Sequence, residues 1–148
     1  MRKLMAFALL LSLFAGCKKD DDKDYGPIDE KIITDYLAAN NIDAQRDPSG
    51  LYYKIINAGS GNVPAFAYVT LFYKGYLTNG QVFDQTKSEA VTFNLGRLIP
   101  GWQIGIPKVG KGGKIQLFVP SALGYGGRAT GSIPANSVLI FEVDVVNY

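Results

Sequence analysis

The stretch FNLGRLIPGW, residues 93–102, decides how the rest of the chain is organised. Within it, Pro100 presets φ and Gly101 is free to adopt a positive φ, so this pair predicts a sharp turn. Trp102, the sole tryptophan, then opens the segment WQIGI, which stops at Pro107 and has room for a helical turn or two. We predict a short helix under a folded sheet, with Trp102 where they meet. Such an apolar floor suits a binding pocket, and an ordinary core tryptophan beside a turn is the alternative.

Outward from this stretch, runs rich in β-branched and aromatic residues predict β-strands. The predicted strands cover residues 51–56, 67–77, 81–84, 91–93, 114–119 and 138–146. The dipeptide Asn79-Gly80 predicts a hairpin between the second and the third of them. Because hairpins link neighbours and only one short internal helix is expected, we predict an α+β fold with a mostly antiparallel sheet.

The first 50 residues divide into three segments of different composition. Residues 1–16 have a basic start and a short apolar run, which is too short for a permanent membrane span and predicts a signal peptide. Residues 17–27 contain the charged run KKDDDKD and predict a flexible tether. Residues 28–49 predict a helix and a linker, because apolar residues recur at helical spacing at Ile28, Ile32, Ile33, Tyr36 and Leu37. This helix needs a surface to pack on, either its own domain or a second copy.

The residues around Cys17 resemble the bacterial lipobox, in which small residues precede a cysteine that becomes lipid-modified. Phe14 stands where that pattern prefers Leu, and a cleaved secretory signal with an incidental cysteine is the alternative. The charged run after Cys17 resembles a surface-export signal of some Gram-negative lipoproteins, or it is a solvated spacer. We therefore expect a lipid on Cys17 to anchor the protein in the envelope of a Gram-negative bacterium. The outer membrane is the expected site, with the protein in the periplasm or exposed at the cell surface.

The composition excludes several kinds of chemistry. The chain has no histidine, which excludes a Ser-His-Asp triad, a Cys-His pair and any His-ligated metal site. Its single cysteine excludes an intrachain disulfide. Once Arg2 and Lys3 are removed with the predicted signal peptide, 13 of the 15 basic residues remain and balance the 13 acidic residues. We expect no metal, no cofactor and no nucleic-acid partner.

Motifs that run in order over residues 50–148 resemble the FKBP-type peptidyl-prolyl cis-trans isomerases. They are VTLFYKG at 69–75, NGQVFD at 79–84, FNLG at 93–96, LIPGW at 98–102, VP at 119–120, LGYG at 123–126, IPAN at 133–136 and LIFEV at 139–143. Each piece is weak alone, and their succession at the family's spacing is specific. The resemblance implies a curled, mostly antiparallel sheet wrapped around one short helix, and it assigns residues 50–148 to the isomerase domain.

The resemblance also implies a pocket with aromatic walls and Trp102 as its floor. The implied aromatic residues are Tyr73, Phe83, Trp102, Tyr125 and Phe141. The alternative is that these aromatic residues belong only to the core or the surface. Leu98 and Ile99 would line one side of the pocket, and the Ile99 backbone N–H would donate to a substrate or macrolide carbonyl.

Three further residues complete the implied site. Asp84 would be the polar group at the rim, although a turn position or a partnership with Arg97 or Lys87 is the alternative. Ile133 would lie on the loop that covers the pocket. Val91 stands where family members often have a second Phe, so we expect a smaller pocket wall at this position. This departure bears on the affinity for macrolide inhibitors more than on isomerase activity.

The chemistry implied by the resemblance needs no nucleophile, metal or cofactor. Rotation about a peptide bond to proline is opposed by a resonance barrier of about 18–20 kcal/mol, and no covalent bond is broken. We expect an isomerase for proline-containing polypeptides that assists the folding of exported proteins. The alternative is a module that binds proline-containing segments, or a chaperone, with weak or no isomerase activity.

Overall fold

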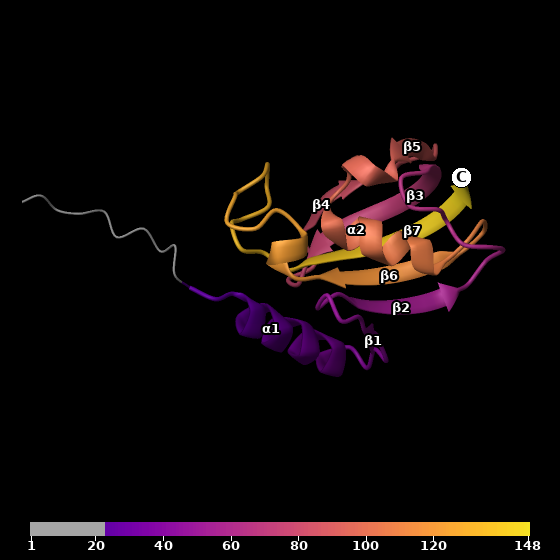
Figure 1. The fold of residues 1–148 in the computed structure, drawn as a ribbon. Helices are drawn as coiled ribbons and strands as arrows, with labels where there is room; N and C mark the ends of the chain where they lie inside the picture. Colours follow the sequence, from indigo (N-terminus) through magenta and orange to yellow (C-terminus); the bar gives the residue numbers. More distant parts are fainter. Residues whose placement is uncertain (1–22) are drawn as a thin grey trace, which may run out of the picture.

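The computed structural model describes residues 23–148, which form one curved sheet with helices on both of its faces (Figure 1). The helices are α1 (Gly26–Ala39) and α2 (Pro100–Gly105), with short 3-10 turns η1 (Leu95–Arg97), η2 (Ile106–Lys108) and η3 (Ser121–Leu123). The strands are β1 (Gln45–Arg46), β2 (Tyr52–Asn57), β3 (Tyr68–Leu77), β4 (Val82–Gln85), β5 (Val91–Asn94), β6 (Lys114–Val119) and β7 (Leu139–Asn147). The predicted fold class is confirmed.

The sheet has seven strands in the order β1-β2-β6-β7-β3-β4, and β5 also pairs with β3. Every pairing is antiparallel. The hairpin at Asn79-Gly80 is present, and Gly80 has φ 87°. Its N–H donates to the Leu77 carbonyl, while the Leu77 N–H donates to the Gln81 carbonyl. This pattern is that of a three-residue loop in which a glycine takes the left-handed position, rather than of the two-residue loop that Asn-Gly favours most.

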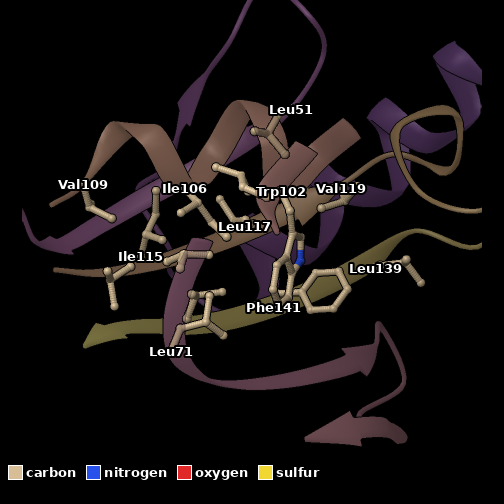
Figure 2. Close-up of a cluster of buried hydrophobic side chains, with 14 of the residues drawn as sticks. Leu51, Leu71, Trp102, Ile106, Val109, Ile115, Leu117, Val119, Leu139 and Phe141 are labelled. Carbon is tan, nitrogen blue, oxygen red and sulfur yellow. The ribbon is translucent and has the colours of Figure 1, made fainter. Parts of the chain in front are cut away.

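Alternation along the central strands builds a core on each face of the sheet. On β6, Ile115 and Leu117 belong to the inner cluster under α2, and Phe118 belongs to the outer cluster. On β7, Phe141 points inward and Ile140 outward in the same way. Figure 2 shows the inner cluster, in which Trp102 of α2 lies against Phe141. Successive side chains of a strand point to opposite faces, so two adjacent strands support both clusters.

The N-terminal helix packs on the outer face of its own sheet. Ile33 and Leu37 of α1 join the outer cluster with Tyr52 and Phe118. The sequence indicated an apolar stripe that included Ile32, but Ile32 is 38% exposed. The buried positions of α1 are Asp29, Ile33 and Leu37, spaced four residues apart. A carboxylate therefore occupies the first turn of the buried face, where the apolar pattern predicted an isoleucine.

Two segment boundaries differ from the prediction. The helix begins at Gly26, inside the expected tether, because Pro27 is accepted in the first helical turn. The predicted linker contains the short strand β1, which pairs with β2 across a turn at Asp47. Two residues are too few for a strand pattern to be visible in a sequence.

Some predictions concern residues that the structure does not describe. The expected signal peptide, residues 1–16, and the expected lipid attachment at Cys17 lie outside residues 23–148. Across residues 23–148, no helix is both long and apolar enough to cross a bilayer. Over the same range, no three side chains of the kinds that hold metals gather in one place.

Candidate functional site

An open cavity of about 320 Å³ lies between α2, β4 and the long connection from β6 to β7. Aromatic and aliphatic side chains form most of its lining. The lining residues are Tyr73, Phe83, Asp84, Phe93, Leu98, Ile99, Trp102, Tyr125, Thr130, Gly131, Ser132, Ile133 and Phe141. Nine of the ten site residues that the sequence predicted on the fold are in this set, and Val91 is the one that is not.

Trp102 is the centre of the aromatic group. Its ring meets Tyr73 and Phe141 edge-on at centroid distances of 5.3 and 5.2 Å, and Phe93 at 6.2 Å. The ring of Phe83 in turn meets Phe141 at 5.5 Å. Edge-to-face packing at these distances is favourable, and each ring limits the rotation of its neighbours. The pocket wall is therefore formed before any ligand enters.

The start of α2 fixes the position of Trp102. Pro100 occupies the first helical turn, and Gly101 follows with its backbone against Val119 of β6. A Cβ on Gly101 would lie 2.6 Å from Val119 Cγ1, so only glycine permits this approach. The close approach brings Trp102 onto the concave face of the sheet, where it is 5% exposed.

Tyr73 and Asp84 form a hydrogen-bonded polar pair in the pocket lining. The Tyr73 hydroxyl donates to Asp84 Oδ2 at 2.6 Å, so the partner of this carboxylate is Tyr73 and not Arg97 or Lys87, which were the alternative to a role at the rim. Two causes raise the pKa of Tyr73 well above its ordinary value. Partial burial is the larger cause, and the hydrogen bond to Asp84 is the second. The tyrosine therefore stays a neutral donor, and the Asp84 carboxylate is held at the rim.

Ile99 presents its backbone to the pocket from the N-cap position of α2. Its carbonyl accepts from the N–H groups of Trp102 and Gln103. Among the described residues, the Ile99 N–H has no hydrogen-bond partner, so it is available to a ligand carbonyl. The Gln103 side chain donates to the Leu98 carbonyl at 2.7 Å and fixes this loop from below. Gln103 was not predicted from the sequence as part of the site. The feature that could have indicated it is a polar residue directly after an otherwise apolar turn.

The flap, residues 124–137 between η3 and β7, supplies the remaining wall. At its tip, Thr130 and Ile133 exchange two backbone hydrogen bonds of 2.9 Å across a turn with Gly131 at φ 55°. This turn buries the Ile133 side chain to 6% exposure, while Tyr125 at the base stays 40% exposed. Sequence reasoning did not identify Thr130, Gly131 and Ser132 as lining residues, because loop side chains give no periodic signal.

Val91 does not line the cavity, which corrects the prediction for this residue. Val91 pairs with Leu71 at the start of β5 and is 40% exposed. Phe93 lies two residues further along the same face of β5, about 7 Å away by strand geometry, and it contacts Trp102 and Tyr73. The aromatic wall at this strand therefore comes from Phe93, and the small side chain at Val91 does not widen the pocket.

Comparisons with known proteins agree with this geometry. The sequence model of the FKBP-type peptidyl-prolyl cis-trans isomerase family matches residues 61–146. The FKBP-type isomerase FkpA of Aeromonas hydrophila is 40% identical over 134 residues, which is 87% of this chain and 50% of that protein. The outer membrane protein MIP of Legionella longbeachae is 40% identical over 104 residues, which is 68% of this chain and 45% of that protein.

Among solved structures, the crystal structure of FkpA from Escherichia coli has a TM-score of 0.73 and 34% sequence identity. The match covers 82% of this chain and 60% of that chain. The chain belongs to the FKBP-type peptidyl-prolyl cis-trans isomerase family. It spans about half the length of the curated relatives that it matches.

Proposed function

We propose that the protein is a peptidyl-prolyl cis-trans isomerase whose active site is the aromatic cavity around Trp102. The observation that carries the proposal is the Ile99 N–H, which has no partner in the part of the chain that the structure describes and lies beside an apolar floor. A proline ring would lie on the Trp102 face, apolar surface against apolar surface. The carbonyl before or after the proline would then accept from Ile99.

The pocket would accelerate rotation by binding the twisted amide better than the planar one. A planar amide has more charge separation, so an apolar pocket favours the twisted form, and a well-placed donor adds to that difference. Each tenfold gain in rate requires about 1.4 kcal/mol of such differential binding. Contacts with Phe83, Tyr125 and Phe141 and one hydrogen bond are enough for a useful acceleration, without covalent chemistry.

A direct test measures cis-trans exchange of a short Leu-Pro peptide by NMR, with and without the purified protein. We expect exchange well above the uncatalysed rate, and a loss of at least about tenfold in kcat/KM for Phe83→Ala, because Phe83 lines the cavity at half-burial. Full activity in a folded Phe83→Ala variant would contradict the assignment of the site.

The second candidate is a binding module that holds proline-containing segments without catalysis. The open shape of the cavity and the 40% exposure of Tyr125 favour it, because an open pocket excludes water less well. The same NMR experiment separates the two functions. Measurable peptide binding with exchange at the background rate would select the binding module. Competition by a macrolide inhibitor against the peptide would test the proposed macrolide site.

We also propose that the protein assists the folding of exported proteins from a lipid anchor on Cys17. The lipobox-like sequence supports this location, and the name of the Legionella relative places that protein at an outer membrane. A Cys17→Ser variant should move from the membrane fraction to the soluble fraction of the envelope. Protease treatment of intact cells then distinguishes surface display, in which the protein is cleaved, from a periplasmic position.

A further inference from the structure

Asp29 is a carboxylate buried away from the pocket, on the face of α1 that meets the sheet. It is 1% exposed, and its Oδ2 accepts two hydrogen bonds from Ser121. The Ser121 N–H donates at 2.8 Å and the Ser121 hydroxyl at 2.6 Å. Burial shields these two hydrogen bonds from competition with water, and a hydrogen bond is electrostatically stronger inside a protein than in water. This pair is therefore a firm link between α1 and the segment that follows β6.

The link continues into the flap through the backbone. The Ser121 carbonyl accepts from the N–H groups of Gly124 at 3.0 Å and Gly126 at 2.8 Å. The Gly126 carbonyl then accepts from the Asn136 N–H at 2.8 Å. Since Gly124 and Gly126 belong to the start of the flap and Asn136 to its end, one chain of hydrogen bonds from Asp29 joins both ends.

The same network holds the flap residues that line the cavity. Tyr125 lies between the two glycines that donate to the Ser121 carbonyl. Ile133 lies on the tip, between the two ends that the Gly126–Asn136 bond brings together. Figure 1 shows this connection, in orange to yellow, beside the N-terminal end of α1. A change at Ser121 therefore reaches a wall of the pocket through two hydrogen bonds.

We propose that Asp29 is a positioning residue, which acts through Ser121 to hold the flap against the pocket. The inference rests on the proposed isomerase function and extends it to a helix outside the matched family region, residues 61–146. The other buried residues of α1, Ile33 and Leu37, pack on the outer face of the sheet, and their apolar side chains cannot form hydrogen bonds. Asp29 thus has a role in the site that simple helix packing does not supply.

The two carboxylate oxygens allow a sharp experiment. Oδ2 takes both bonds from Ser121, whereas Oδ1 has no hydrogen-bond partner among the described residues. An Asn at this position can place its side-chain oxygen where Oδ2 of Asp29 lies and so accept both bonds from Ser121. Its NH₂ group then takes the place of Oδ1, where no bond is lost. Asp29→Asn is therefore the conservative variant, Asp29→Ala removes the link, and Asp35→Ala on the exposed face of α1 is the matched control.

The experiment combines amide hydrogen exchange of Gly126 and Asn136 with NMR exchange kinetics on a Leu-Pro peptide. For Asp29→Ala we expect flap amide exchange to rise by about tenfold or more, and KM to rise about fivefold with kcat within about twofold. This split follows because the flap contacts planar and twisted substrate alike. Asp29→Asn should recover most of both effects, and Asp35→Ala should behave as the unchanged protein.

Two results would overturn the proposal. The first is a folded Asp29→Ala protein with unchanged flap exchange and unchanged KM. The second is an Asp29→Asn protein that is as impaired as Asp29→Ala, which would assign the effect to charge or to general stability. If Asp29→Ala does not fold, the proposal is tested by measuring flap exchange and KM in Asp29→Asn and in Ser121→Ala. We then expect Ser121→Ala to be impaired and Asp29→Asn to behave as the unchanged protein. If the unchanged protein lacks isomerase activity, the proposed function fails, and flap exchange with peptide affinity still tests the link.

Discussion

At the scale of single residues, the rings around Trp102 and the Tyr73–Asp84 pair have different tasks. We expect Trp102→Leu to lower kcat/KM by about a hundredfold, because it removes the apolar floor of the proposed site and part of the edge-on packing. Asp84→Ala should cost less than about tenfold, because Asp84 is exposed at the rim and its side chain is bonded, within residues 23–148, to the Tyr73 hydroxyl alone. NMR exchange on the same Leu-Pro peptide gives both values. A larger loss for Asp84→Ala would assign the chemistry to the carboxylate.

The Tyr73 hydroxyl gives a prediction in alkaline solution. Because its pKa is raised by burial and by the bond to Asp84, the phenol stays neutral where an ordinary tyrosine, with a pKa near 10, ionises. Only the unfolded state then releases this proton, so this group contributes stability that falls as the pH rises above about 10. Tyr73→Phe should show a smaller fall in the free energy of unfolding between about pH 9 and pH 11, measured with urea. Equal slopes in both proteins would contradict the assigned shift.

Gly75 keeps two of the aromatic rings in place. A Cβ there would lie 2.5 Å from Phe83 Cε2 and 2.8 Å from Phe141 Cε1, so the rings of the cavity would have to move. We expect Gly75→Ala to lower stability by about 1–3 kcal/mol and kcat/KM by about tenfold. Thr78→Ala, at the exposed hairpin next to the same strand, is the control that should change neither quantity. An unchanged kcat/KM in Gly75→Ala would mean that the rings adapt.

Single residues also show how much of the site could be predicted from the sequence. The motifs placed Trp102, Phe83 and Phe141 in one cavity, because their order along the chain was specific. They did not predict the partner of Asp84 or the role of Asp29. The Asp29–Ser121 bond joins residues 92 positions apart, and no local periodicity reports such a contact. An acidic residue in the first turn of a helix, such as Asp29, is favoured by the helix N-terminus, and this describes its position but not its bonds.

At the scale of elements, β6 illustrates what local patterns determine. Its predicted and observed bounds agree, because polar and apolar residues alternate over Lys114–Leu117 and the apolar pair Phe118-Val119 leads to Pro120. The sequence did not determine which surface α1 packs on, because an amphipathic helix can cover its own sheet or a second copy of the chain equally well. The outer cluster around Phe118 decides between them, because the sheet itself presents an apolar face to α1.

The contribution of α1 to stability is testable with two neighbouring residues. Ile33 is 1% exposed in the outer cluster, and Ile32 beside it is 38% exposed. We expect Ile33→Ala to cost about 2–5 kcal/mol of unfolding free energy and Ile32→Ala less than about 0.5 kcal/mol. Urea unfolding followed by circular dichroism measures both. Similar costs at the two positions would contradict the packing of α1 on this sheet.

An ion pair joins the turn between β1 and β2 to the last residue of η2, the 3-10 turn that follows α2. Lys108 Nζ lies 2.7 Å from Asp47 Oδ2, and both side chains are mostly buried. This bond, with those from Ser49, lowers the pKa of Asp47 to about 2. A depressed carboxyl pKa contributes stability above the unfolded value near 4, and this contribution is lost as the pH falls towards 2. We therefore expect Asp47→Asn to lower the free energy of unfolding by about 1–2 kcal/mol at pH 7.

The pH dependence provides the check on that ion pair. The difference between Asp47→Asn and the unchanged protein should shrink as the pH falls from about 4 to about 2, because protonation of Asp47 removes the charge that the Asn variant already lacks. Urea unfolding at several acidic pH values measures this difference. A difference that stays constant down to about pH 2 would show that the loss comes from the turn and not from the charge on Asp47.

At the scale of the whole molecule, one sheet supports two cores and thereby couples α1 to the proposed active site. Strands β6 and β7 send alternate side chains to the inner cluster under α2 and to the outer cluster under α1. Loss of α1 would leave Phe118 and Ile140 uncovered on the outer face, at a cost of roughly 2 kcal/mol for each large apolar side chain. The same loss would remove the Asp29 link to the flap.

We therefore predict a single cooperative unfolding transition in which α1 melts together with the sheet. Fluorescence of Trp102 reports the inner core, since it is the sole tryptophan, and amide exchange at Ile33 reports α1. In urea, the fluorescence midpoint should coincide with that of circular dichroism, and the free energy of opening at Ile33 should equal that of global unfolding. Exchange at Ile33 through an opening that costs several kcal/mol less would instead make α1 a separate unit. The flap would then have two states, with Asp29 attached to Ser121 in one and detached in the other, and peptide affinity would follow the fraction attached.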